Sequence, residues 1–382
     1  MKNFLRSLFE RVYALRDMDF LTVVPVFLLF WVGLLSIYSA TAGRGDIVKY
    51  FVYRQAIWGT IAFGAFLFVF CVGHERLLKW SAIVYASVLF LMALVLIAGT
   101  VSRGSQSWID IGSLLHLGQV RIQPSELGKV ALSLVLASWL SRFPPNKLKN
   151  FLGALAVAGL SGALVLLQPD LGTAAVYGCI TLAALFASGA LGKYLAILLS
   201  IVVGCMPLGW HFLKEYQRLR LLVFINPYLD PLGAGYNVIQ SRIAVGAGGL
   251  WGKGFLKGTQ SKLYFLPEPH TDFIFSVFAE EFGFVGSVII VLLFGFLLWR
   301  LLGIAKIVKD KRAKIFIVGI SAWIWFQVIE SLAMSMGLAP VTGLPLPFLS
   351  YGGSSLVSVG IALGIVQSIY VSTKKQYRLT LD

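Results

Sequence analysis

The chain has 382 residues, of which 58% are hydrophobic and only 13% are charged. A soluble domain is about half apolar and a quarter charged, so this composition excludes an ordinary soluble protein. The net charge of +15 points to basic cytoplasmic loops and anionic lipid, not to nucleic acid. The three cysteines and four histidines are scattered without disulfide or ligand spacing, so we expect no disulfide framework and no protein metal site.

Apolar stretches long enough to cross a membrane recur along the whole chain. A helix needs about 20 residues to span the roughly 30 Å hydrocarbon core. The sequence predicts ten such helices, at residues 20–40, 55–73, 80–99, 124–141, 150–168, 171–190, 193–211, 273–300, 315–338 and 353–372. We therefore expect an all-α, polytopic membrane protein. Residues 1–382 form a single membrane domain in this prediction, with a leader at 1–19 and a tail at 373–382.

The distribution of Lys and Arg predicts the orientation of these helices. With ten spans and an internal amino terminus, the cytoplasmic segments hold 19 of these residues and the short outer loops hold 5. An excess of Lys and Arg is typical of cytoplasmic loops. We expect a protein of the bacterial cytoplasmic membrane with both termini in the cytoplasm. The segments near 100–123, 212–272 and 339–352 are then on the outer face.

Two of the predicted spans each carry a pair of charged residues. Glu126 and Lys129 are three residues apart near the start of the fourth span, and hence lie on one helical face. Glu280 and Glu281 lie in the eighth span, where adjacent side chains diverge by about 100°. Charges at such depth cost at least a few kcal/mol, so they either form structural ion pairs or line a water-accessible groove.

The segment 212–272, between the seventh and eighth spans, is too long for a simple connector. Loops of this length are usually functional or disordered, and the aromatic residues interleaved along this one argue against disorder. We expect a packed outer cap with an interfacial helix near 236–247. Its glycine-rich stretch at 248–254 is not a phosphate loop, because Ala247 and Gly254 stand where that motif requires Gly and Ser or Thr.

Asp272 is the last residue of the cap and directly precedes the amino-terminal end of the predicted helix at 273–300. A carboxylate in this position can cap the helix, or it can serve as a general base, which also has to be ionised. A further polar segment, 344–355, leads into the last span. Its prolines and glycines imply an irregular backbone that faces protein or a cavity, and its freed N–H groups can bind an anion.

Several short motifs resemble those of the SEDS family (shape, elongation, division and sporulation). They are Gln123-Pro124-Ser125-Glu126 with Lys129, Gln168-Pro169-Asp170-Leu171-Gly172-Thr173, Gly258-Thr259-Gln260-Ser261, Phe265-Leu266-Pro267-Glu268, His270-Thr271-Asp272-Phe273 and Pro347-Phe348-Leu349-Ser350-Tyr351-Gly352-Gly353-Ser354. The similarity covers nearly the whole chain in the family's order. The run at 226–236 resembles the elongation branch, RodA, more than FtsW or SpoVE.

The resemblance implies a peptidoglycan glycosyltransferase that polymerises lipid II into glycan strands on the outer face of the membrane during cell elongation. Asp272 matches the family's carboxylate, and it is the expected general base toward the acceptor 4-hydroxyl. The expected partners are lipid II, the growing glycan strand and a class B penicillin-binding protein of the PBP2 type. Other membrane proteins of the elongation complex are further candidates.

The leaving pyrophosphate requires no protonation, so the acid of a glycosidase is not needed. Its negative charge does require cationic partners or a divalent cation such as Mg or Mn. The candidates are Arg54, Lys129, Arg218, Arg220 and Arg242, each of which can equally be a loop cation or a lipid contact. Glu126, Ser350 and Trp108 complete the expected substrate-binding set, although Trp108 also suits the interfacial aromatic belt.

Two other functions fit parts of the same sequence. A lipid II flippase could use Glu126, Lys129 and Glu280 as a path for the headgroup, and a scaffold for the elongation machinery is compatible with either activity. The inner loops are short and simply basic, which favours the enzyme. The chain departs from the family pattern at Ser107 and Ser331, so no phosphate ligand or side-chain amide is carried over to these positions.

Overall fold

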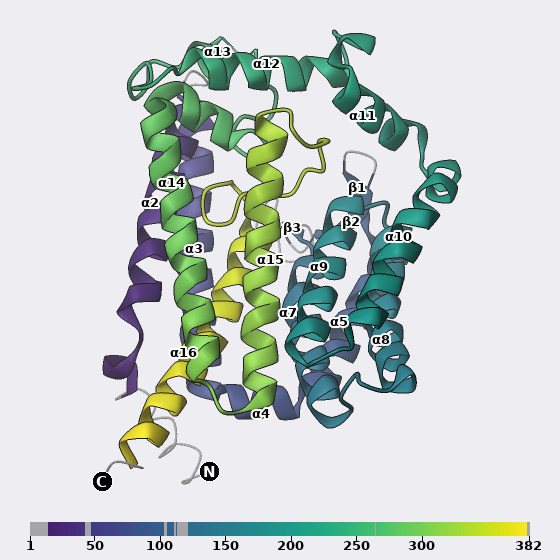
Figure 1. Ribbon diagram of the computed structural model, residues 1–382. Helices are drawn as coiled ribbons and strands as arrows, with labels where there is room; N and C mark the ends of the chain where they lie inside the picture. Colours follow the sequence, from purple (N-terminus) through teal and green to yellow (C-terminus); the bar gives the residue numbers. More distant parts are fainter. Residues whose placement is uncertain are drawn as a thin grey trace.

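The computed structural model describes residues 14–42, 47–102, 105–110, 112, 121–263 and 265–379. Residues 1–13 of the expected leader and 380–382 of the tail lie outside this part. Ten long helices in the described chain pack into a bundle (Figure 1). They are α2 (Phe20–Thr41), α3 (Ile47–Val72), α5 (Ser81–Ala98), α7 (Pro124–Arg142), α8 (Leu148–Leu167), α9 (Leu171–Ala187), α10 (Gly192–Phe212), α14 (Ile274–Ile307), α15 (Lys311–Ser335) and α16 (Gly353–Leu379). Each coincides with one predicted span, which confirms the polytopic all-α fold.

Length and composition suit eight of these helices to cross a membrane, and the other two are α7 and α9. Helix α9 is apolar but has only 17 residues. Helix α7 carries Glu126 and Lys129, and most of its residues are buried. It tolerates these charges because it packs against α5, α9, α15 and α16, so that its polar groups face protein.

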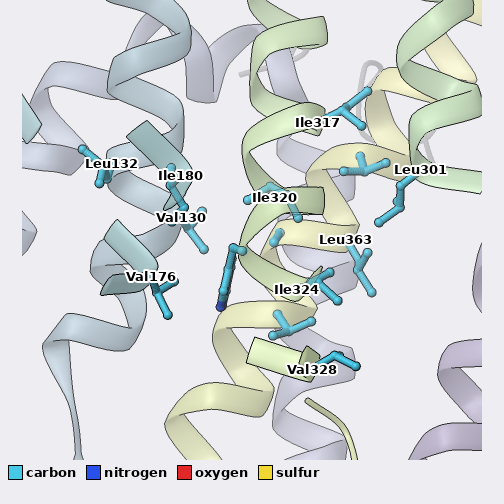
Figure 2. Packing of buried hydrophobic residues seen from close by; sticks show 14 of the residues in the cluster. Val130, Leu132, Val176, Ile180, Leu301, Ile317, Ile320, Ile324, Val328 and Leu363 are labelled. Carbon is cyan, nitrogen blue, oxygen red and sulfur yellow. The ribbon is translucent and has the colours of Figure 1, made fainter. Parts of the chain in front are cut away.

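The centre of the bundle is formed by α7, α9, α15 and α16. Figure 2 shows Val130 of α7 beside Ile180 of α9, and Ile320 and Ile324 of α15 facing Leu363 of α16. Within lipid, such contacts stabilise the fold through van der Waals packing, because the lipid tails are as apolar as the side chains. Helix α10 differs, since none of its residues is buried.

The segment between α10 and α14 folds across the end of the bundle that is opposite the termini (Figure 1). It contains α11 (Glu215–Ile225), the short 3-10 helix η2 (Pro227–Leu229), α12 (Ala234–Ala247) and α13 (Thr259–Lys262). The helix expected near 236–247 is present as α12. We refer to residues 213–272 as the cap.

A buried carboxylate ties the cap to α14. Glu280 accepts hydrogen bonds from Lys253 Nζ at 2.6 Å, from the Thr259 amide at 2.8 Å and from the Gln260 amide at 3.2 Å. Gly283 interrupts α14 with φ of 66°, and a Cβ at this position would lie 2.3 Å from the amide nitrogen of Gly252. Only glycine fits this close approach of backbone to backbone.

A small antiparallel sheet, which the sequence analysis did not predict, lies between α5 and α7. Its strands are β1 (Thr100–Ser102), β2 (Ser105–Asp110) and β3 (Arg121–Ile122), in the order β1-β2-β3. At the end of the bundle that carries the termini are the short helices η1 (Ala14–Asp17) and α4 (His74–Lys79). There the guanidinium group of Arg300 donates two hydrogen bonds, of 2.7 and 2.9 Å, to the carboxylate of Asp19.

Candidate active site

A cavity of about 560 Å³ opens beneath the cap. Its walls come from the start of α3, the small sheet, the turn between α8 and α9, helix α11, the end of the cap and the loop between α15 and α16. The lining residues with polar or aromatic side chains include Arg54, Trp108, Arg121, Glu126, Asp170, Tyr216, Arg220, Glu268, Asp272, Thr342, Tyr351 and Ser354. Segments far apart in the sequence therefore converge on one site.

Asp272 lies half-buried on the wall of this cavity. It also lines a second cavity of about 130 Å³ between the cap and the start of α14. Phe273 is the N-cap residue of α14 and makes no side-chain cap hydrogen bond. Asp272 therefore does not occupy the N-cap position that one interpretation of the sequence gave it, and its carboxylate borders both cavities.

The backbone around Asp272 is held by the loop that leads into α16. Ser350 Oγ donates a 2.7 Å hydrogen bond to the carbonyl oxygen of Thr271, and the Tyr351 amide donates one of 2.9 Å to the carbonyl oxygen of His270. The Leu346 amide donates to Ser350 Oγ at 2.9 Å. Ser350 is itself absent from the cavity wall, so the structure places this candidate substrate residue behind the site, as a support.

Three of the described arginines line the cavity from different elements: Arg54 from α3, Arg121 from β3 and Arg220 from α11. Arg220 donates a 3.3 Å hydrogen bond to the carbonyl oxygen of Val341 and lies over the ring of Tyr216 at 5.6 Å. A guanidinium group can bind two phosphate oxygens at once. Arg121 was not among the residues predicted from the sequence, although it lies only two residues before the Gln123-Pro124 motif.

The amino-terminal end of α16 also borders the cavity. Gly352, Gly353, Ser354 and Ser355 all line it, and α16 begins at Gly353. The first N–H groups of a helix have no intrahelical acceptor, and the helix dipole is positive there. This end of α16 therefore suits an anion, as its glycine- and serine-rich sequence predicts.

The predicted Glu126–Lys129 pair is formed, with Lys129 Nζ 2.6 Å from Glu126 Oε1. Glu126 reaches the cavity wall, and its Oε2 has no hydrogen-bond partner among the described residues. Lys129 is completely buried beneath it, 3.4 Å from Gln327 Oε1 and 5.3 Å from the ring centroid of Trp323. The structure thus places one member of the pair at the cavity and the other below its floor.

Two candidate phosphate-binding arginines lie away from the cavity. Arg218 donates to the carbonyl oxygens of Trp210 and His211, at 3.0 and 2.8 Å. Arg242 donates to the carbonyl oxygen of Gly337 at 2.7 Å. Both guanidinium groups are engaged with backbone oxygens at the ends of neighbouring helices, and neither residue lines the cavity.

Three described tyrosines line the cavity, and two of them, Tyr216 and Tyr351, are at least partly buried. Burial raises the pKa of Tyr216, although the nearby Arg220 opposes this, and burial likewise raises the pKa of Tyr351. Both phenols therefore remain protonated at neutral pH and can donate hydrogen bonds. Burial also raises the pKa of Asp170, whose Oδ1 accepts from the Thr173 amide at 2.9 Å and whose Oδ2 accepts from Gln123 at 3.2 Å.

Comparison with known proteins supports this picture. The model of the cell cycle protein family FTSW_RODA_SPOVE matches residues 19–375. The chain belongs to this family. It is 41% identical over 297 residues to the peptidoglycan glycosyltransferase MrdB of Escherichia coli K12, covering 77% of this chain and 79% of MrdB.

Solved structures of family members have the same fold. One is a chain of a peptidoglycan synthase complex that coordinates polymerization and crosslinking, with a TM-score of 0.79, 30% identity and coverage of 93% of this chain and 98% of that one. Another is the rod shape determining protein RodA of Thermus thermophilus, with a TM-score of 0.69, 28% identity and coverage of 92% and 96%. The resemblance to RodA noted in the sequence is thus confirmed in three dimensions.

Proposed function

We propose that this protein is a peptidoglycan glycosyltransferase that polymerises lipid II, with Asp272 as its general base. The observation that carries the proposal is the position of Asp272 on the wall of a cavity that three arginines and the start of α16 also line. A carboxylate that shares a cavity with three arginines suits the attack of a sugar hydroxyl on a carbon that bears a pyrophosphate. The family membership and the similarity to MrdB support the same reaction.

In the proposed reaction, Asp272 removes the proton from the acceptor 4-hydroxyl as the oxygen attacks the anomeric carbon of the donor. The new glycosidic bond forms while the bond from that carbon to the pyrophosphate oxygen breaks. The isoprenoid pyrophosphate departs with the electron pair, and the anomeric configuration inverts. Arg54, Arg121 and Arg220 would stabilise the developing negative charge, aided by the N–H groups at the start of α16.

We place the cap on the outer face of the cytoplasmic membrane and both termini in the cytoplasm. The termini lie at the end of the bundle opposite the cap (Figure 1). The short loops assigned to the terminal end are rich in Lys and Arg, which supports this orientation. Lipid II assembled for wall growth would then reach the cavity from the outer leaflet.

The burial of Lys129 favours the enzyme over a flippase. A headgroup path across the bundle would need polar groups that remain accessible below the cavity. Lys129 instead has no exposed surface, and it is enclosed by Glu126, Gln327 and Trp323.

Among the described residues no group of three or more His, Cys, Asp or Glu could hold a metal ion. A divalent cation that arrives bound to the pyrophosphate is the alternative to the arginines for balancing the negative charge of the pyrophosphate.

A class B penicillin-binding protein is the proposed partner, because a chain of a peptidoglycan synthase complex shares this fold. Other elongation-complex membrane proteins would dock on the same assembly. The test is polymerisation of purified lipid II in detergent, with and without the partner and divalent cation. Glycan strands are expected from the wild type. Transport of labelled lipid II across liposome membranes without polymer formation would instead identify a transporter. If the protein neither polymerised nor transported lipid II, the scaffold role would be the function that remains.

A further inference from the structure

A second carboxylate lies behind the cavity wall that carries Asp272. Glu330, in the last two turns of α15, has only 8% of its surface exposed. Its Oε1 accepts a short hydrogen bond from Thr342 Oγ1, and its Oε2 has no hydrogen-bond partner among the described residues. A buried carboxylate that is only half satisfied is costly, so its presence in an apolar helix requires an explanation.

Glu330 is connected to Asp272 through the segment 341–345. Thr342 and Gly343 line the cavity together with Asp272, and a Cβ built on Gly343 would lie 3.9 Å from Asp272 Oδ2. Helix α15 holds this segment at two points, because Gln327 Nε2 also donates to the carbonyl oxygen of Pro345 at 3.0 Å. The segment is thus a rigid wall fixed between Glu330 and Asp272, and the two carboxylates are near enough to interact electrostatically.

We propose that Glu330 is a positioning residue for the general base. It holds the Thr342–Gly343 wall against Asp272 and, once Glu330 is ionised, its negative charge favours the transfer of a proton to Asp272. This inference rests on the proposed function of Asp272. Neighbouring carboxylates titrate as a coupled pair, so the activity should depend on two ionisations on its acid side.

Other charged and titratable groups line the same cavity as Asp272. They are Tyr50, Arg54, Arg121, Glu126, Asp170, Tyr216, Arg220, Glu268, His270 and Tyr351, and Lys129 is buried beneath Glu126. A substitution at Glu330 leaves all of them in place. Any difference between the pH profiles of the wild type and a Glu330 variant can then be assigned to Glu330, because the other groups contribute equally to both profiles.

Glu281 of α14 provides a matched control. It too is buried, with 1% of its surface exposed, its Oε1 accepts a short hydrogen bond from a hydroxyl group, that of Ser39, and its Oε2 has no partner among the described residues. It faces α2 and the glycine-rich part of the cap, with its Oε1 3.4 Å from a Cβ built on Gly258. Glu330→Gln and Glu281→Gln therefore each remove a negative charge from a buried carboxylate, but only the first is beside Asp272.

The experiment measures kcat/KM for lipid II polymerisation against pH, with the complete protein and its partner. In Glu330→Gln the pH profile should lose one of its two ionisations on the acid side, so its acid limb should move to lower pH by roughly half to one unit. The plateau value of kcat/KM should also be lower, because the negative charge that favours proton transfer to Asp272 is gone. Glu330→Met, which suits an apolar helix, should move the limb equally. It should lower the plateau further, because it also loses the bond from Thr342. Glu281→Gln should keep the wild-type limb.

An acid limb that stays in place in both Glu330 variants overturns the inference, as does an equal shift in Glu281→Gln. Asp272→Asn separates this result from failure of the proposed function. If that variant is inactive while the Glu330 profiles match the wild type, only the role of Glu330 is lost. If Asp272→Asn polymerises normally, the assignment of the base itself fails.

Discussion

Ser350 Oγ lies 2.7 Å from the carbonyl oxygen of Thr271, the residue that precedes Asp272. This hydrogen bond joins the loop before α16 to the end of the cap, so the proposed base and the proposed anion-binding end of α16 are fixed relative to each other. Catalysis depends on such relative placement, since small displacements of a reacting group can cost about a hundredfold in rate.

Ser350→Ala should therefore reduce polymerisation more than it reduces stability. The loss of the bonds to Thr271 and Leu346 should lower kcat by about 10- to 100-fold. The cost in unfolding free energy should be only about 1–3 kcal/mol. Ser358→Ala is the control, because the Ser358 hydroxyl is buried in α16 without a hydrogen-bond partner among the described residues. If both variants lose activity equally, the support role of Ser350 is wrong.

Arg220 and Arg218 provide a test of which cations contact the pyrophosphate. They lie two residues apart in α11, but only Arg220 lines the cavity. Arg220→Ala should raise the KM for lipid II by at least about tenfold, the equivalent of losing one charge-assisted hydrogen bond. Arg218→Ala should change it by less than about twofold. Steady-state polymerisation kinetics distinguish the two, and the reverse order would refute the assignment of the cavity.

Glu280 should matter for the stability of the cap. Glu280→Ala leaves the amides of Thr259 and Gln260 without their acceptor and Lys253 without its ion pair. We expect the free energy of unfolding to fall by about 2–4 kcal/mol, and the segment 248–263 to become sensitive to proteases. Lys253→Ala should cost less than about 1 kcal/mol, since the Lys253 side chain is 30% exposed. Thermal unfolding in detergent and limited proteolysis measure both effects, and an unchanged proteolysis pattern in Glu280→Ala would exclude this anchor.

The interruption of α14 offers a separate test of backbone packing. A methyl group at Gly283 would meet the amide of Gly252 at 2.3 Å, in a backbone conformation with φ of 66°. Gly283→Ala should therefore destabilise the protein by about 2–4 kcal/mol. Gly295→Ala is the control, because a Cβ there meets no atom within 4 Å, and it should be neutral or slightly stabilising. Equal melting temperatures for the two variants would contradict the close contact between cap and helix.

The sequence predicted the helices well because the membrane constrains them. A span must be largely apolar over a fixed length, so the apolar stretches of the sequence were enough to place the ten helices, although only eight of them meet the criteria of length and composition by themselves. The small sheet escaped prediction because its strands have only two to six residues and depend on contacts with neighbouring helices. Short strands of this kind carry little periodic signal.

The candidate site was predicted less completely, because position along the chain does not show where a long side chain ends. Arg218 and Arg220 both looked suitable, yet their directions on α11 differ by about 200°, and only Arg220 reaches the cavity. Glu330 was visible as a charge within a span, but its link to Asp272 depends on the fold of the loop at 341–345. Such links between distant segments become apparent only in three dimensions.

The most direct test of the central claim is lipid II polymerisation by Asp272→Asn, which preserves the shape of the side chain but removes the base. Asp230→Asn is the matched control, because Asp230 precedes a cap helix outside the cavity, where it accepts from the Gly233 and Ala234 amides, and Asn serves equally well there. We predict that Asp272→Asn binds lipid II normally but polymerises it at least about a thousandfold more slowly, while Asp230→Asn behaves as wild type. Polymerisation by Asp272→Asn within a few fold of the wild-type rate would contradict the account.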